Sequence, residues 1–134
     1  MKKKICIIVG NYYSAIANNL LSGSIKILKD KNISYKKILA PGIFEIPYII
    51  SKNINKYDAF IALGCVIKGK TSHYDLISKA TTDAIMHLSI VHKKPIGNGI
   101  ISCFNKKQAV ERSNPKIKNK GTEAARAILN VLGI

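Results

Sequence analysis

The chain has 134 residues, 47% of them hydrophobic, and a net charge of +15 at pH 7. This length predicts one domain over residues 1–134, and this hydrophobic content excludes a disordered chain. No run of about 18 apolar residues is present, and the three cysteines are widely spaced without a C-x-x-C pair. We therefore expect a cytoplasmic protein without a membrane span, a zinc site or a disulfide framework.

The first half of the chain alternates predicted strands with predicted helices. Residues 5–9 form a continuous apolar run, which is typical of a strand buried on both faces. Residues 14–31 carry apolar side chains at helical spacing, and residues 33–39 alternate in a way that suits an edge strand. After a Pro-Gly pair we expect a short helix with Pro47 near its first turn. Residues 59–63 are apolar throughout, as in a central strand.

The next helix is predicted from a capping box. Ser72 would be its N-cap, and Asp75 lies three residues later. The spacing of apolar residues predicts an inward face made of Ile77, Ala80, Ala84, Leu88 and Val91.

The last elements complete the alternation. We expect a fourth strand over residues 95–101, a helix from a cap at Asn105 to about Arg112, and a final helix that starts at Thr122. The inward residues of that final helix would be Ala124, Ile128 and Val131. Strands alternating with helices predict an α/β fold with a parallel sheet covered on both faces. Ligands of such sheets bind outside the carboxyl ends of the strands, where the strand order reverses.

Residues 64–71 match the P-loop pattern G-x-x-x-x-G-K-T between a predicted strand and a predicted helix. Two features argue against a nucleotide triphosphatase. Val66 and Ile67 are bulky where a loop around phosphate needs small side chains, and no later apolar strand ends in an aspartate for Mg²⁺. We interpret the loop as an anion site, because the N-terminus of a helix beside a lysine and a threonine favours bound phosphate.

Four segments, at residues 9–13, 41–47, 64–75 and 108–112, together resemble the lumazine synthase (6,7-dimethyl-8-ribityllumazine synthase) family. The likeness runs from the first strand to the last helix. It implies a three-layer flavodoxin-like fold, with a four-stranded parallel sheet and helices on both faces. It also implies a transferase of riboflavin biosynthesis, which condenses 5-amino-6-(D-ribitylamino)uracil with 3,4-dihydroxy-2-butanone 4-phosphate and releases phosphate and water.

The resemblance implies a role for each matching residue. It places the pyrimidine and ribityl groups against Tyr12, Ile43, Phe44, Glu45, Cys65, Val66, Ile67 and Asn98. It assigns the phosphate group to Lys70, Thr71, Arg112 and Lys120. His73 would be the catalytic residue that transfers protons, and the family implies no metal and no organic cofactor.

Taken alone, several of these residues also have an ordinary structural interpretation. Tyr12 can be a core aromatic residue at a strand end, and Glu45 can complement a helix dipole. Arg112 can be a cation at a helix C-terminus, Lys120 can be a solvated lysine, and a histidine such as His73 at a helix start is often only polar surface.

The sequence departs from the family pattern at several positions. Asn11 and Lys68 stand where arginine is common, and Lys70 stands where alanine is common. Asn98 falls where many members have a phenylalanine that reaches the pyrimidine of the next subunit. The segment before the first strand is shorter than in many members, which leaves the assembly open. The family implies a homopentamer, or a shell of pentamers, with the active site shared between adjacent subunits.

Three functions remain open at this point. The first is the synthase. The second is a catalytically weak flavin- or lumazine-binding module, suggested by Asn11 and Asn98. The third is a basic nucleic-acid-binding protein, suggested by the charge of +15. The lysines are scattered, and no stripe of interleaved aromatic residues accompanies them, so we favour the synthase and expect no specific nucleic acid.

Overall fold

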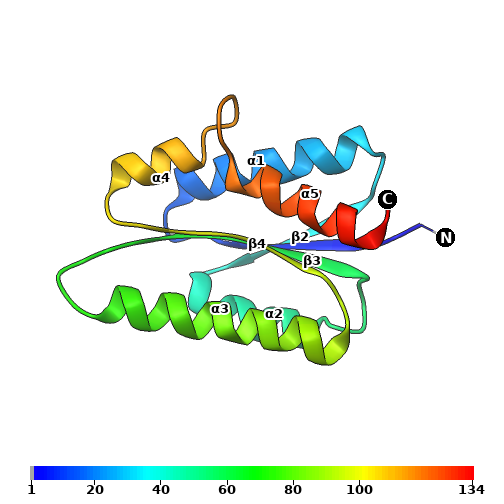
Figure 1. Ribbon diagram of the computed structural model, residues 1–134, viewed down its shortest axis with the longest axis horizontal. Helices are drawn as coiled ribbons and strands as arrows, with labels where there is room; N and C mark the ends of the chain where they lie inside the picture. Colours follow the sequence, from blue (N-terminus) through cyan, green and yellow to red (C-terminus); the bar gives the residue numbers. More distant parts are fainter. Residues whose placement is uncertain (1) are drawn as a thin grey trace.

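Four parallel strands form the centre of the computed structural model, which describes residues 2–134 (Figure 1). The strands are β1 (Ile5–Gly10), β2 (Tyr35–Ala40), β3 (Ala59–Ile67) and β4 (Ile96–Cys103). Their order across the sheet is β2-β1-β3-β4, and all neighbours pair in parallel. The parallel sheet is therefore confirmed, with β2 at an edge and β3 inside.

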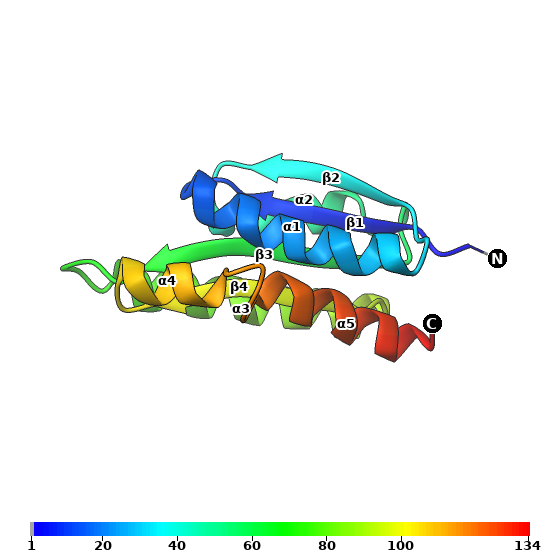
Figure 2. The same ribbon diagram turned by 90° about the horizontal axis from the view of Figure 1, so that it is seen from above.

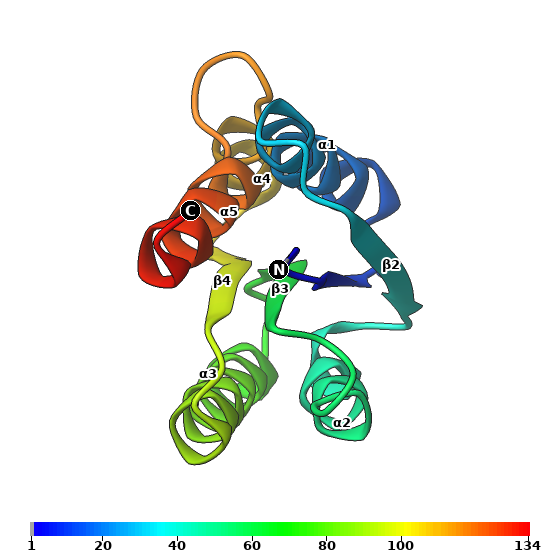
Figure 3. The ribbon, with the colours of Figure 1, turned by 90° about the vertical axis from the view of Figure 1, so that its right-hand side faces the viewer.

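Helices cover both faces of this sheet, as Figure 3 shows in a view along the strands. One face carries α1 (Ser14–Asp30), α4 (Lys106–Arg112) and α5 (Lys120–Leu132). The other carries η1 (Ile43–Glu45), α2 (Ile46–Lys52) and α3 (His73–His92). From above, α1 and α5 run beside each other over the sheet (Figure 2). The predicted three-layer α/β arrangement is confirmed. Within residues 2–134, none of the helices is long and apolar enough to cross a membrane.

The core has two parts, one on each face of the sheet. Ile5, Ile7 and Val9 of β1 pack with α1 and α5, whereas Cys6 and Ile8 pack with η1, α2 and α3. Because successive side chains of a strand point to opposite faces, a strand covered on both sides must be apolar at every position. This explains the continuous apolar run that begins the sequence.

The chain changes direction across the sheet at β1 and β3. Strand β1 lies between β2 and β3, and α1 and α3, which follow β1 and β3, cover opposite faces. Loops that leave adjacent strands toward opposite faces open a crevice at the carboxyl ends of those strands. Strand β3 also runs to Ile67, four residues past its predicted end, so it extends beyond β1.

The prediction for the final helix was wrong in two respects. Helix α5 begins at Lys120, two residues before Thr122, because the Asn119 side chain caps it by accepting a hydrogen bond from Thr122 N at 3.1 Å. Val131 was predicted to point inward, but 72% of its surface is exposed. Ala124 and Ile128 are buried as predicted.

Helix α3 also differs from its prediction. Its buried residues are Thr81 and Ile85, whereas Ala80 and Val91, predicted to point inward, are exposed. The helix is apolar on more than one side, so periodicity alone could not select the side that packs on the sheet. Ser72 is the N-cap, but its side chain makes no capping hydrogen bond; the His73 N–H donates to Thr71 Oγ1 at 3.3 Å instead.

The cap of α4 follows its prediction. Asn105 Oδ1 accepts a hydrogen bond from Gln108 N at 2.9 Å. Gln108 Oε1 in turn accepts one from Phe104 N at 2.8 Å. These two bonds satisfy backbone donors at the start of the helix, so the short helix begins at a defined residue beyond the end of β4.

Candidate active site

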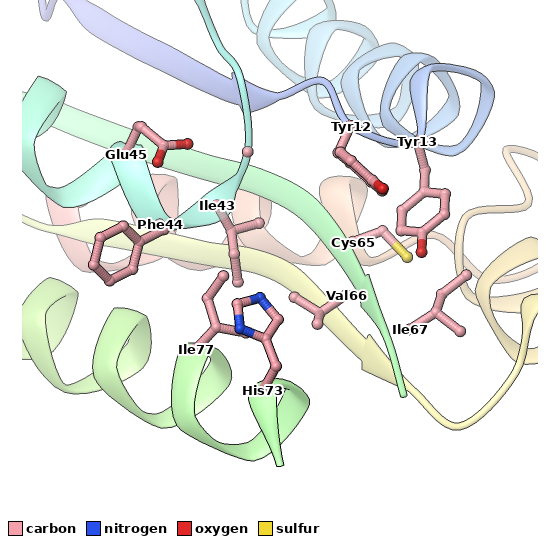
Figure 4. Close-up of a pocket in the computed structure, with 11 residues that line it drawn as sticks. Tyr12, Tyr13, Ile43, Phe44, Glu45, Cys65, Val66, Ile67, His73 and Ile77 are labelled. Atoms are coloured by element: carbon pink, nitrogen blue, oxygen red, sulfur yellow. The ribbon is translucent and has the colours of Figure 1, made fainter. Parts of the chain in front are cut away.

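A pocket of about 530 Å³ opens at the carboxyl ends of β1 and β3 (Figure 4). The crevice expected at the reversal of strand order is therefore present. The predicted residues that line it are Tyr12, Ile43, Phe44, Glu45, Cys65, Val66, Ile67 and His73. They come from the loop after β1, from η1, from the end of β3 and from the first turn of α3. Segments far apart in the sequence are thus brought together around one cavity.

Two glycines bring η1 close to the sheet. A Cβ atom at Gly64 would lie 2.6 Å from Ile43 Cγ2, and a Cβ atom at Gly10 would lie 3.0 Å from the backbone of Gly42. Neither position has room for a larger residue without movement of the turn. This close approach places Ile43, Phe44 and Glu45 at the edge of the pocket, with Ile43 buried and Phe44 62% exposed.

Tyr12 and Tyr13 form an aromatic pair at one side of the pocket. Their ring centroids are 4.9 Å apart, and the ring planes meet at 84°. The Tyr12 side chain is 74% exposed, whereas Tyr13 is half-buried against the core. Tyr13 was not predicted as a site residue. Its position directly after Tyr12, at the carboxyl end of the first strand, was the signal that could have identified it.

His73 is the first residue of α3 and lies at the pocket mouth. Its imidazole ring is exposed and points into the pocket, near Ile43 and Ile77 (Figure 4). An exposed imidazole at the edge of a cavity can exchange protons with both a bound molecule and water.

Burial disfavours ionisation of the Cys65 thiol in the pocket wall. Burial, with a smaller contribution from Cys103, raises the pKa of the Cys65 thiol to about 12. Nucleophilic chemistry by cysteine needs the thiolate, which such an environment disfavours. The Cys65 side chain thus lines the wall as a thiol that disfavours ionisation.

The backbone of β3 is free on one side where it reaches the pocket. Strand β1 pairs with β3 only as far as Leu63, whereas β4 pairs with it up to Ile67. Residues 65–67 therefore have a strand partner on the β4 side alone. Unpaired backbone groups of a strand edge need hydrogen-bond partners, and a ligand with donors and acceptors in a plane can supply them.

The remaining predicted residues lie outside this pocket within one chain. Lys70 and Thr71 are exposed in the loop before α3. Asn98 is exposed on β4, where its Oδ1 accepts a hydrogen bond from Ile100 N at 3.1 Å. Arg112 and Lys120 line a second hollow of about 270 Å³ at the ends of β4, α4 and α5. A single chain therefore does not bring the whole predicted site together.

The second hollow is positively charged. Arg112, Lys118 and Lys120 line it, and Glu123 is the acidic residue among its lining residues. Lys120 Nζ lies 3.8 Å from Glu123 Oε1, and Arg112 Nη1 donates a long hydrogen bond of 3.5 Å to Ser102 O. Three cations against one carboxylate can hold a phosphate group, for which the planar guanidinium of Arg112 is well suited.

The described residues offer no ready metal site. Within residues 2–134, no group of three or more histidine, cysteine, aspartate or glutamate side chains is close enough together to hold a metal ion. The chemistry that the pocket supports with its own side chains is stacking on Tyr12, hydrogen bonding to Glu45 and proton transfer at His73.

Comparison with known proteins gives consistent matches along the chain. A sequence model described as 6,7-dimethyl-8-ribityllumazine synthase matches residues 2–134. A protein of that name from Buchnera aphidicola subsp. Baizongia pistaciae is 44% identical over 142 residues, which cover 99% of this chain and 87% of the relative. The one from Wigglesworthia glossinidia brevipalpis is 41% identical over 139 residues, which cover 98% of this chain and 89% of the relative. The one from Bartonella tribocorum is 37% identical over 139 residues, which cover 100% of this chain and 92% of the relative.

Proposed function

The chain belongs to the 6,7-dimethyl-8-ribityllumazine synthase family, and we propose that it carries out the family reaction in the pocket lined by Tyr12, Glu45 and His73. The family consists of transferases of riboflavin biosynthesis. The reaction joins 5-amino-6-(D-ribitylamino)uracil to 3,4-dihydroxy-2-butanone 4-phosphate, with loss of inorganic phosphate and water. Neither the flavin-binding module nor the nucleic-acid-binding protein is favoured.

The pyrimidine substrate occupies the part of the pocket between Tyr12 and the end of β3. The Tyr12 ring is exposed and has a free face on which a uracil ring can stack. The free backbone edge at Cys65, Val66 and Ile67 supports hydrogen bonds to the uracil carbonyl and imide groups. Asn98 lies outside the pocket of its own chain, so its contact with the substrate requires a neighbouring copy.

The ribityl chain lies along η1. Ile43 and Phe44 supply apolar surface, and the Glu45 carboxylate accepts hydrogen bonds from the ribityl hydroxyl groups. Because a carboxylate can accept several hydrogen bonds, one residue can orient more than one hydroxyl group.

The phosphate group of the second substrate binds between two copies of the chain. Lys70 and Thr71 precede α3 in the copy that supplies the pocket, and Arg112 and Lys120 come from the cationic hollow of the neighbouring copy. The separation of these two groups within one chain supports this arrangement, because an interface that joins pocket and hollow would unite them. Substrates held on two facing surfaces react as if in one molecule, which removes much of the entropy cost of their encounter.

His73 transfers protons during the reaction. The amine nitrogen attacks the ketone carbonyl, and water leaves as the imine forms. Elimination of inorganic phosphate from the imine then leaves an enol, which tautomerises to a new carbonyl group. The second nitrogen attacks this carbonyl, and a second water leaves as the ring closes. Each step adds or removes protons, and an exposed imidazole at the pocket mouth can take and return them. Because positioning contributes in parallel, loss of His73 alone would leave part of the rate.

The assembly is a homopentamer, or a shell built from pentamers. Large apolar side chains are exposed on both the pocket side and the hollow side of the chain. They include Phe44, Tyr48, Leu76, Ile90, Val110 and Val131. Interfaces bury such side chains, and a head-to-tail interface that closes gives a ring.

The location is cytoplasmic, which suits three buried free cysteines.

This proposal rests above all on the meeting of His73 with Tyr12 and Glu45 in one pocket. The test is a direct assay with both substrates, which follows lumazine absorbance and phosphate release above the uncatalysed background. Arg112→Ala should raise KM for the phosphorylated substrate. Arg126→Ala should not, because Arg126 is an exposed arginine on α5 that does not line the hollow. A folded, oligomeric wild type without any acceleration would contradict the proposal and leave the binding module as the explanation.

A further inference from the structure

Tyr13 lines the pocket, and the family resemblance implies no role for it. We propose that Tyr13 is a positioning residue, which holds the ring of Tyr12 in the orientation that receives the pyrimidine substrate. The inference rests on the proposed function, because it assumes that the substrate stacks on Tyr12. It adds a residue that acts through another side chain without touching the reacting atoms.

The Tyr12 ring needs external support to stay in one orientation. Its side chain is 74% exposed, and none of the hydrogen bonds found within residues 2–134 involves its hydroxyl group. The residue lies between the end of β1 and the start of α1, outside both elements. An exposed aromatic ring loses rotational freedom when a ligand stacks on it, and this loss weakens binding unless the ring is already held.

Tyr13 is held firmly by two other parts of the molecule. Its backbone is the N-cap of α1, and its carbonyl oxygen accepts a hydrogen bond from Ala17 N at 2.9 Å. Its half-buried ring packs against the core cluster that includes Cys65. Burial raises the pKa of the Tyr13 hydroxyl, so the residue stays uncharged beside the apolar wall. A ring fixed at both backbone and side chain can support a mobile neighbour.

The contact between the two rings has the geometry of an attractive pair. A centroid distance of 4.9 Å and an interplanar angle of 84° describe an edge-to-face contact, which aromatic rings prefer over direct face-to-face stacking. Such a contact uses at most one face of Tyr12, so the other face remains available to the substrate. Figure 4 shows Tyr12 beside Tyr13 at the wall that Cys65 and Ile67 complete.

The test is a double-mutant cycle between the two tyrosines. KM for each substrate is measured in wild type, Tyr12→Leu, Tyr13→Leu and the double variant. Tyr13→Leu should raise KM for the pyrimidine about threefold to tenfold and leave KM for the phosphorylated substrate within about twofold. In the Tyr12→Leu background the same change should add less than about twofold, because the ring that Tyr13 supports is gone.

Two further variants separate this role from core packing and from a direct substrate contact. Tyr13→Phe keeps the ring and should restore the wild-type KM. Tyr35→Leu is the matched control, because Tyr35 is also a half-buried tyrosine packed against the same core cluster but lies at the amino end of β2. Its loss should lower the melting temperature without a selective change in KM for the pyrimidine.

Equilibrium binding of the product, 6,7-dimethyl-8-ribityllumazine, is measured with the same variants. An inactive wild type that still binds product would contradict the proposed function. The double-mutant cycle between Tyr12 and Tyr13 could then still be measured through product binding. Equal effects of Tyr13→Leu with and without Tyr12 would overturn the inference, because the two rings would then act independently. A rise in KM for the pyrimidine in Tyr13→Phe as large as that in Tyr13→Leu would also overturn the inference, because the hydroxyl group would then be the functional part.

Discussion

Among single residues, the three cysteines show most clearly how burial sets chemistry in this chain. Cys6, Cys65 and Cys103 are all buried and free. Desolvation raises the pKa of the Cys6 thiol to about 11 and that of Cys65 to about 12, from an ordinary value of 9.0. The folded protein therefore favours the neutral thiols, whereas the unfolded chain releases their protons at lower pH.

We expect the free energy of unfolding to fall as pH rises from about 9 toward 11. A group whose pKa is raised on folding stabilises the native state fully below its unfolded pKa, and this stabilisation is lost as pH rises toward the folded pKa. Denaturant unfolding at a series of pH values measures the effect. Cys6→Ala should make the free energy of unfolding depend less steeply on pH, because Cys6 is buried in the core on the α2 and α3 side.

The same burial predicts slow alkylation. At pH 8 the native protein should react with iodoacetamide far more slowly than the protein unfolded in denaturant, in which all thiols are accessible. Rapid modification of Cys65 in the native state would show that the pocket wall opens or that its thiol ionises more readily than burial allows.

Among the elements, the packing of α1 on α5 depends on small residues and buried hydrogen bonds. Asn119 Nδ2 donates to Asn19 O at 2.8 Å and to Ser113 O at 3.0 Å, and Ser24 Oγ donates to Gly121 O at 2.7 Å. These bonds tie the N-cap and the first turn of α5 to α1 and to the end of α4. They thereby fix the positions of Arg112 and Lys120, the two cations assigned to the phosphate.

Gly121→Ala tests how closely the two helices must approach. A Cβ atom there would lie 2.0 Å from Leu20 O, a backbone atom of α1 that cannot move alone. We expect a loss of about 1–3 kcal/mol in the free energy of unfolding. Gly69→Ala is the control, because a Cβ atom at Gly69 would have no neighbour within 4 Å, and this change should alter stability by less than about 0.5 kcal/mol. Equal denaturation midpoints for the two variants would show that α1 can move away from α5 without a loss in the free energy of unfolding.

At the scale of the whole molecule, the exposed apolar side of α3 predicts assembly. Ile90 is 67% exposed and Leu76 66% exposed on this helix. We expect Ile90→Asp to prevent the proposed oligomer from forming, because a carboxylate buried in an apolar interface without a partner is strongly unfavourable. Sedimentation velocity measures the change, and activity should fall with it. An unchanged oligomer would place the subunit interface elsewhere.

A shared active site predicts that two defective variants can restore each other. His73→Ala lacks the pocket residue that we propose for proton transfer, and Arg112→Ala lacks a cation of the separate hollow. When the two are unfolded together and reassembled, about a quarter of the interfaces should combine an intact pocket with an intact hollow.

Activity is measured for the mixed assembly and for each variant reassembled alone. Activity of the mixed sample well above that of either variant supports a site built from two chains. No recovery in properly reassembled mixtures would mean that Arg112 acts within its own chain.

Much of this architecture could be predicted from local patterns. The apolar run of β1 and the cap at Asn105 are visible in consecutive residues, and the alternation of strands with helices predicted the edge of the sheet where the pocket lies. A strand covered on both faces needs an unbroken apolar run, a cap needs a polar side chain at the helix start, and parallel sheets bind ligands at the carboxyl ends of their strands. The sequence also carried the likeness to the synthase family, through motifs short enough to be read directly.

Other features were decided only by the tertiary structure. Which side of α3 is buried and the outward position of Val131 depend on contacts with distant segments. The support of Tyr12 by Tyr13 and the separation of Arg112 from the pocket likewise required the packed molecule. The physical reason is that helix rotation and side-chain direction are set by packing across the sheet, where the interacting residues are far apart in the sequence.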